Sequence, residues 1–213
     1  MIKIFKSRGF TLVELLIAAA VLTIMLSFIL ANFRTGQKSS DLNIALKQAL
    51  DGLTTVRNKS LAGQLVNGSY PIGGYYFHID YSQPSQFVLF GRIQPLVYGQ
   101  SSYQTGLIND LRTKQFSNVR FIEVCARRPL GVQEELGLPC QSAGWEKISW
   151  QNSQDFLEIN FNLPDEVLVN YNQYNQDDGY VYLGGVIKHQ LNNLSAYFYI
   201  DLRSGLVSGD IIP

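Results

Sequence analysis

The chain has 213 residues, of which 46% are apolar and 16% are charged, so it is too apolar for an intrinsically disordered protein. Its 17 basic and 17 acidic side chains give a formal net charge of zero, and no basic excess indicates nucleic-acid binding. The two cysteines, Cys125 and Cys140, are too few for a disulfide scaffold, and their spacing matches no zinc motif.

The chain begins with a short basic segment that is followed by a long apolar one. Residues 1–9 contain Lys3, Lys6 and Arg8 and no acidic side chain, and residues 10–33 contain one charged side chain, Glu14. A membrane-spanning helix needs about 20 apolar residues, so residues 10–33 are long enough to cross a bilayer. The preceding cations predict that residues 1–9 stay in the cytoplasm and that the C-terminal bulk lies outside.

Two common kinds of N-terminal apolar segment fit this pattern poorly. A secretory signal peptide has a shorter apolar core and a small-residue cleavage site, whereas residues 31–36 read Ala-Asn-Phe-Arg-Thr-Gly. A plain membrane anchor fits the length and the flanks. It leaves Glu14 unexplained, unless that side chain lies near the interface, because a charge deep in hydrocarbon costs about 2.5–3.5 kcal/mol.

The segment from Arg8 to Leu16, Arg-Gly-Phe-Thr-Leu-Val-Glu-Leu-Leu, resembles the class III signal of type IV prepilins. In that family a basic leader ends in Gly, a Phe follows, and a Glu is fifth in the mature chain. The resemblance implies that a prepilin peptidase cuts between Gly9 and Phe10, that Phe10 is N-methylated, and that the apolar helix is kept. It also implies that Glu14 acts in assembly by meeting the N-terminus of an adjacent subunit.

The physical chemistry of these residues agrees with the resemblance. Gly9 has no side chain to obstruct a protease, and cleavage there creates an ammonium group on Phe10 at the start of an apolar helix. Glu14 lies about one helical turn further on and is the available counter-ion, within its own chain or in a neighbour. Many pilins carry Gly and Pro inside this helix, but residues 23–31 contain neither, so we expect a more continuous helix.

Residues 34–62 continue the helical pattern as an amphipathic segment. One stripe consists of Leu42, Leu46, Leu50, Leu53 and Val56, which recur at steps of three and four residues. The opposite face consists of Lys38, Asp41, Lys47, Asp51 and Arg57. We expect the stripe to pack on the following sheet; the alternative is a bundling face for other helices. Gly36 and Gly52 are expected to weaken the helix locally.

After breaks at residues 62–63 and 67–74 the pattern becomes that of β-strands. Alternation or β-branched and aromatic content predicts strands at residues 75–79, 86–90, 119–124, 145–150, 156–161, 180–183 and 196–200. Gly184-Gly185 is interpreted as a bulge or a turn. No internal repeat or low-complexity tract is present.

These elements predict an α+β fold, with a long N-terminal helix packed on an antiparallel β-sheet domain, which again resembles pilins. The expected organisation is a cleaved leader at 1–9, a membrane-spanning half-helix at 10–33, an amphipathic half-helix at 34–62 and a β-rich globular domain at 63–213. Residues 74–92 also look like the strands that open the globular region of minor pilins and H-type pseudopilins of type II secretion. Residues 199–207 look like their last hairpin.

No pattern of catalytic or metal-ligating residues is found, so we expect no enzyme activity and no cofactor. His78 and His189 lack partners at metal-ligand spacing, apart from Asp80, and His78 with Asp80 is interpreted as a surface pair. Residues 175–179, Asn-Gln-Asp-Asp-Gly, lack the alternating oxygen ligands of a calcium loop and are interpreted as an ordinary turn.

Tyrosines are frequent in the predicted sheet region, and they allow two interpretations. Packing within the sheet is the simpler one, and an exposed patch that binds a partner subunit, a glycan or a surface is the alternative. The tyrosines concerned are Tyr70, Tyr75, Tyr76, Tyr171, Tyr174, Tyr180 and Tyr182.

The predicted topology bears on the two cysteines. If the C-terminal bulk faces an oxidising compartment, Cys125 at the end of a strand and Cys140 at the end of a Pro- and Gly-containing loop are expected to form a disulfide. The alternative is two free, partly buried thiols. A bond requires α-carbons about 4.4–6.8 Å apart.

The functional hypothesis is therefore a structural subunit of a type IV filament system, either a minor pilin or a secretion pseudopilin. The expected partners are the membrane, the prepilin peptidase and other pilin or pseudopilin subunits, in the bacterial inner membrane and then in a periplasmic or cell-surface filament. The alternative is a surface-binding pilin, for adhesion or DNA uptake. Cleavage of the leader removes three of the 17 basic side chains, so the mature chain has 14 basic and 17 acidic ones. DNA uptake is disfavoured because this mature chain has no basic excess.

Overall fold

The computed structural model describes residues 11–65, 68–69, 71–92, 108–129, 137–148, 155–162, 166–171, 180–191 and 193–212. The chain divides into two compact units, residues 1–39 and residues 40–213, and each is described by itself. The second unit contains the C-terminal part of the helix and all described strands, and it is called the globular unit below.

One helix, α1 (Leu12–Leu61), runs without interruption through 50 residues, as the absence of proline predicts. In the globular unit its predicted apolar stripe is the buried face. Leu42, Leu46, Leu53 and Val56 are buried in the main core, and Leu50 packs against that core. The sequence therefore predicted the packing face of the helix correctly.

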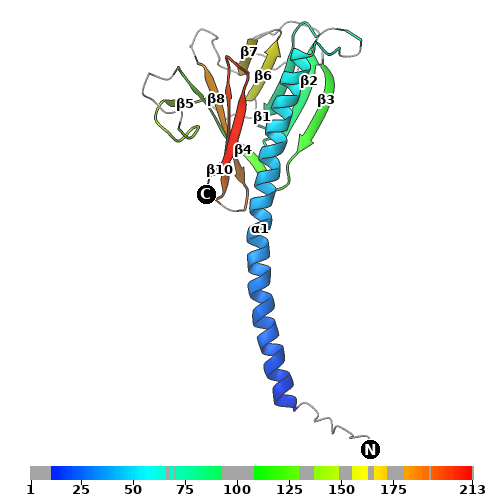
Figure 1. The fold of residues 1–213 in the computed structure, drawn as a ribbon, viewed down its shortest axis with the longest axis vertical. Coiled ribbons are helices and arrows are strands. Elements are labelled where there is room, and N and C mark those ends of the chain that lie inside the picture. Colours follow the sequence, from blue (N-terminus) through cyan, green and yellow to red (C-terminus); the bar gives the residue numbers. More distant parts are fainter. Residues whose placement is uncertain are drawn as a thin grey trace, which may run out of the picture. The chain divides into compact units, whose positions relative to one another are not determined.

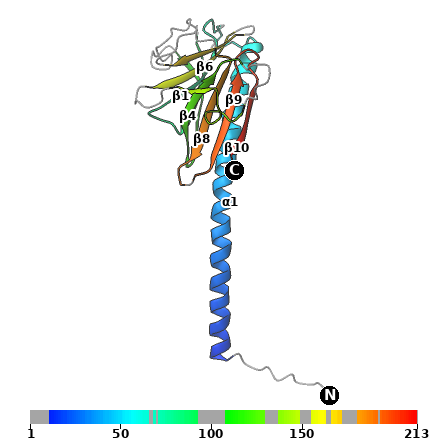
Figure 2. The ribbon, with the colours of Figure 1, turned by 90° about the vertical axis from the view of Figure 1, so that its left-hand side faces the viewer.

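The described strands form two antiparallel sheets of five strands each (Figures 1 and 2). The first sheet has the order β3-β2-β1-β6-β7 and the second has the order β10-β9-β8-β4-β5. The strands of the first sheet are β1 (Tyr75–Asp80), β2 (Gln86–Arg92), β3 (Ile108–Gln115), β6 (Phe156–Asn162) and β7 (Glu166–Tyr171). Those of the second are β4 (Val119–Arg127), β5 (Trp145–Lys147), β8 (Tyr182–His189), β9 (Ser195–Asp201) and β10 (Val207–Ile212).

The seven predicted strands correspond to β1, β2, β4, β5, β6, β8 and β9, and the α+β class is confirmed. Strands β3 and β7 were not predicted, and β10 extends the hairpin expected near the C-terminus. Strand β3 reads Ile-Asn-Asp-Leu-Arg-Thr-Lys-Gln and offers no apolar alternation, so only its pairing with β2 defines it as a strand.

Phenylalanine rings connect the two sheets through the main core. Phe77 on β1 stacks on Phe87 on β2, with ring centroids 4.7 Å apart, and Phe87 contacts Phe116 at 5.6 Å. Phe116 in turn lies 5.5 Å from Phe121 on β4, which meets the ring of Phe198 on β9 edge-on at 6.1 Å. Such pairs add about 0.5–1.5 kcal/mol beyond simple burial.

Close contacts explain three glycines of the globular unit. A β-carbon on Gly52 of α1 would lie 2.7 Å from the Phe87 ring, so the helix approaches β2 closely there. Gly184 and Gly185, interpreted from the sequence as a bulge or turn, instead lie inside β8. The interpretation as a bulge or turn was therefore wrong. Packing requires the glycines: a β-carbon on Gly184 would lie 2.6 Å from Pro139, and one on Gly185 would lie 2.5 Å from Phe198. The neighbouring strand β4 has a bulge between Phe121 and Glu123, which faces Val186 and Ile187 and not the two glycines.

A disulfide joins Cys125 on β4 to Cys140, with α-carbons 5.5 Å apart. Both cysteines are buried, and they pack with Trp145 and Val186 in a small cluster separate from the main core. The disulfide closes the loop between β4 and β5 on the second sheet.

Candidate membrane-anchoring and assembly site

The first turn of α1 is closed by a reciprocal pair of side chains, Thr11 and Glu14. The Thr11 hydroxyl accepts a hydrogen bond from the Glu14 backbone N–H at 3.3 Å. In return Oε2 of Glu14 accepts hydrogen bonds from the Thr11 backbone N–H and hydroxyl, both at 2.9 Å. This is a capping box, in which a residue before the helix and one three positions later satisfy each other's backbone donors.

The capping box adds Thr11, which the sequence interpretation missed, to the candidate site. Glu14 was singled out as a charge in an apolar run, but Thr11 was not considered, although the Thr-x-x-Glu spacing before an apolar run is a known signature of a helix start. The contacts hold the Glu14 carboxylate toward the N-terminal end of the helix. Gly9 and Phe10, the predicted processing site, lie outside the described residues.

The N-terminal part of α1 is built as an apolar cylinder. Its large aliphatic and aromatic side chains from Leu12 to Phe33 are all about half exposed or more in the monomer. Its two central hydroxyls bond to the helix backbone: Thr23 Oγ1 donates to the Ala19 carbonyl and Ser27 Oγ to the Thr23 carbonyl, each at 2.8 Å. Polar groups satisfied in this way are tolerated in hydrocarbon. By length and composition, α1 is long and apolar enough to cross a membrane.

A comparison with protein families finds the prokaryotic N-terminal methylation motif at residues 4–30. The match covers most of the basic segment, the predicted cut and the first turns of α1. The chain carries the signal of a type IV pilin-like prepilin. No curated protein and no solved structure matches the chain.

Among the described residues, the others considered from the sequence form no second site in this pilin-like chain. His78, interpreted as part of a surface pair with Asp80, is instead buried, so that interpretation was wrong. The register of β1 and β6 places His78 opposite Glu158, and His78 Nδ1 lies 3.2 Å from a Glu158 carboxylate oxygen. Asn170 donates to the other oxygen of Glu158 at 3.0 Å. Asp80 accepts from the Ser82 backbone N–H at 2.8 Å and so shapes the following turn.

His189 is also buried, at the end of β8, and it links the second sheet to the helix. Its Nδ1 accepts a hydrogen bond from the Leu191 backbone N–H at 3.1 Å, and its Nε2 lies 3.7 Å from an Asp41 carboxylate oxygen on α1. Among the described residues no group of three His, Cys, Asp or Glu side chains is arranged to hold a metal ion. The predicted turn at residues 175–179 lies outside the described residues.

Most of the tyrosines that the structure describes pack within the protein. Tyr75 and Tyr76 are buried, while Tyr180 and Tyr182 are partly buried. Tyr180 donates to Glu146, and the Arg128 guanidinium lies 5.7 Å from its ring centroid. Tyr70, Tyr174 and the side chain of Tyr171 lie outside the described residues. The alternative of an exposed tyrosine patch therefore gains no support from the described tyrosines.

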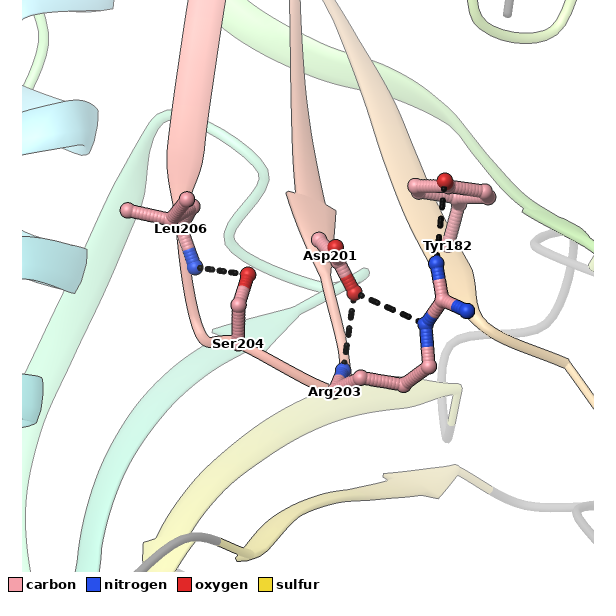
Figure 3. A network of polar contacts seen from close by, with 5 residues as sticks. All are labelled: Tyr182, Asp201, Arg203, Ser204 and Leu206. Carbon is pink, nitrogen blue, oxygen red and sulfur yellow. Dashed lines mark hydrogen bonds and ion pairs between the residues drawn. The ribbon is translucent and has the colours of Figure 1, made fainter.

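The hydroxyl of Tyr182 takes part in a polar network with the turn after β9 (Figure 3). Arg203, in the turn after β9, donates from Nη2 to the Tyr182 hydroxyl at 3.2 Å, and its Nε lies 3.5 Å from Asp201 Oδ1. The Arg203 backbone N–H also donates to Asp201 at 2.9 Å. Partial burial opposes ionisation of Asp201, but these contacts and those of Ser204 outweigh burial and lower the pKa of its carboxyl. This network fixes the turn between β9 and β10.

Proposed function

We propose that this chain is a structural, non-catalytic subunit of a type IV filament system, a minor pilin or a secretion pseudopilin. The observation that carries the proposal is the N-terminal methylation motif, which coincides with the start of an apolar helix of membrane-spanning length. In the proposed pathway the chain is inserted into the inner membrane with its globular unit outside, and prepilin peptidase then removes residues 1–9.

Processing would convert an anchor into an assembly element. Cleavage after Gly9 leaves a positive amine on Phe10, and methylation of that amine keeps the charge. The structure holds the Glu14 carboxylate against Thr11, the residue next to this amine, so the counter-charge is already oriented toward the helix start. In a filament the same carboxylate would pair with the Phe10 amine of a neighbouring subunit, away from water, where such a pair is strongest.

The exposed apolar surface of α1 supports this role. Between Leu12 and Phe33 the large apolar side chains are about half exposed or more, so they need lipid or other helices around them. The same surface serves both stages, with lipid contacts before assembly and contacts with the helices of neighbouring subunits afterwards.

The proposal is tested by following the full chain in a host that carries its filament system. We expect the processed chain in the sheared or detergent-extracted filament fraction, cross-linked to other pilin-like subunits, and its absence from that fraction when the assembly ATPase is deleted. Recovery of the chain in the membrane alone, equally with and without the ATPase, would contradict the proposal.

A further inference from the structure

A small pocket in the globular unit lies between α1 and the β3 edge of the first sheet (Figure 1). Its volume is about 110 Å³. The residues that line it are Thr55, Val56 and Lys59 from α1, Leu89 from β2 and Arg112 from β3. Thr55 and Lys59 are four residues apart, so they are neighbours on one side of the helix.

The pairing of β2 with β3 explains how an arginine reaches this pocket. Arg112 is directly opposite Leu89 in the register of the two strands, so both side chains start on the same face of the sheet. Leu89 is buried in the main core, whereas Arg112 is exposed because β3 is the edge strand. Arg112 therefore borders the pocket from the sheet edge, while Leu89 and Val56 form its buried floor.

The two cations of the pocket have no acidic partner. Among the described residues no carboxylate lies within ion-pair distance of Lys59 or Arg112, and none lines the pocket. By contrast, Arg128, Lys147 and Arg203 each lie 3.6 Å or less from a carboxylate oxygen. A lysine in the last turn of a helix complements the helix dipole, which accounts for Lys59 but not for Arg112 beside it.

The hydroxyl of Thr55 is also available to a ligand. Its neighbour Thr54 donates to the Leu50 carbonyl at 2.8 Å, which is a common arrangement for threonine inside a helix. Within the part of the chain that the structure describes, the Thr55 hydroxyl makes no such bond. The pocket thus combines two positive charges and a hydroxyl with an apolar floor.

We propose that this pocket binds a carboxylate group that is carried on a short apolar stem. The guanidinium of Arg112 matches a carboxylate through two parallel hydrogen bonds, and Lys59 adds a second positive charge. The floor of Val56 and Leu89 contacts the stem. A cavity of about 150 Å³ holds benzene, so this smaller pocket holds a stem of only a few carbon atoms. Phosphate and sulfate have no apolar part to cover the floor, so they are poorer ligands.

A carboxylate on a short stem has two sources, a free short-chain carboxylic acid and a glutamate side chain of a peptide. Both present the same chemistry to Arg112 and Lys59. The proposal goes beyond the filament function proposed above and does not depend on it, because binding is measured on the full chain in detergent without any assembly.

The test is saturation-transfer NMR of the detergent-solubilised full chain, with empty micelles as the blank. The probes are butyrate and the peptide Gly-Glu-Gly with both ends blocked. Their uncharged counterparts, butyramide and blocked Gly-Gln-Gly, keep the size and shape of the probes. We expect at least one carboxylate probe to receive saturation from the protein and neither amide to do so.

Two double variants locate the binding in this pocket. Lys59→Gln with Arg112→Gln should weaken binding of the carboxylate probe by about tenfold or more, because hydrogen bonds to charged groups are lost. The matched control, Lys47→Gln with Arg120→Gln, removes one exposed cation from α1 and one from a strand outside the pocket and should bind normally. Thr55→Val should weaken binding by a smaller factor, because it removes one neutral donor. All variants should melt with the unchanged chain.

The two probes distinguish the sources of the ligand. Binding of the peptide without butyrate would identify a protein partner, and binding of butyrate without the peptide would identify a free acid; either result supports the site. Equal binding of the amides, or undiminished binding by the Lys59→Gln, Arg112→Gln chain, would show that these cations do not recognise the ligand and would overturn the proposal. Failure of both carboxylate probes to bind would overturn it as well.

Discussion

Replacement of Glu14 by alanine is expected to remove the chain from filaments while leaving it in the membrane. Insertion should be unaffected or improved, because a charge leaves the apolar run. Assembly should suffer because the Phe10 amine of a neighbouring subunit would be buried without its counter-ion. Removal of one partner from a buried ion pair costs about 3–5 kcal/mol, which corresponds to a loss of incorporation of roughly a hundredfold or more.

The capping box allows the charge of Glu14 to be separated from its structural role. Glutamine at position 14 can still bond to the Thr11 backbone N–H, as capping boxes with glutamine do, but it carries no charge. We therefore expect Glu14→Gln to fail in assembly as severely as Glu14→Ala, with filament incorporation measured by immunoblot of sheared fractions. Normal incorporation of Glu14→Gln beside a defective Glu14→Ala would show that only the cap matters and that the charge pair is not needed.

Thr11→Ala is the complementary control. It removes the hydroxyl that accepts from Glu14 N–H but keeps the carboxylate. Loss of a capping side chain costs about 0.5–2 kcal/mol, which is less than the loss of a buried counter-ion. The ordering of the three variants, with Thr11→Ala the mildest, therefore follows from the charge-pair account.

Reduction of the Cys125–Cys140 disulfide is expected to lower the melting temperature of the globular unit without unfolding it at room temperature. The bond closes a loop with a sequence separation of 15 residues, which is worth about 3 kcal/mol on the chain-entropy account. For a domain of this size 1 kcal/mol shifts the melting temperature by about 2–4 °C, so we expect a decrease of roughly 6–12 °C. The main core lies elsewhere and should stay intact.

The measurement is the thermal unfolding of the detergent-solubilised chain, followed by circular dichroism with and without reductant. The double variant Cys125→Ala with Cys140→Ala is the matched control, because it should melt near the reduced protein and show no response to reductant. If the reduced and oxidised proteins melt at the same temperature, or if thiol titration of protein purified from the envelope without reductant finds two free thiols, the disulfide does not contribute as described.

The helical part of the fold follows directly from the sequence. The apolar run, the absence of proline before residue 71 and the stripe from Leu42 to Val56 predict a continuous helix and its buried face, and the structure agrees. These signals are local, since each depends on residues a few positions apart. The same holds for strands such as β1 and β9, whose apolar and aromatic residues repeat within one segment.

Contacts between distant segments account for what the sequence did not predict. His78 was expected at the surface because Asp80 lies two residues away, but the register of β1 with β6 buries it beside Glu158. Gly184 and Gly185 look like a turn in the sequence, but Pro139 and Phe198, from other segments, require the small residues. Strand β3 is defined by pairing with β2 and not by its own composition. In the candidate site, Thr11 was predictable from its spacing to Glu14, and that signal was overlooked.

The mass of the mature chain, measured on protein extracted from the membrane of a host with an active prepilin peptidase, tests the account most directly. We predict a chain that begins at Phe10 and carries a methyl group on its amine. Gly9→Ala should be processed, whereas Gly9→Trp should keep the leader, because the constraint at the cut is steric. A chain that retains Met1 and residues 1–9 in the presence of the active peptidase would contradict the account.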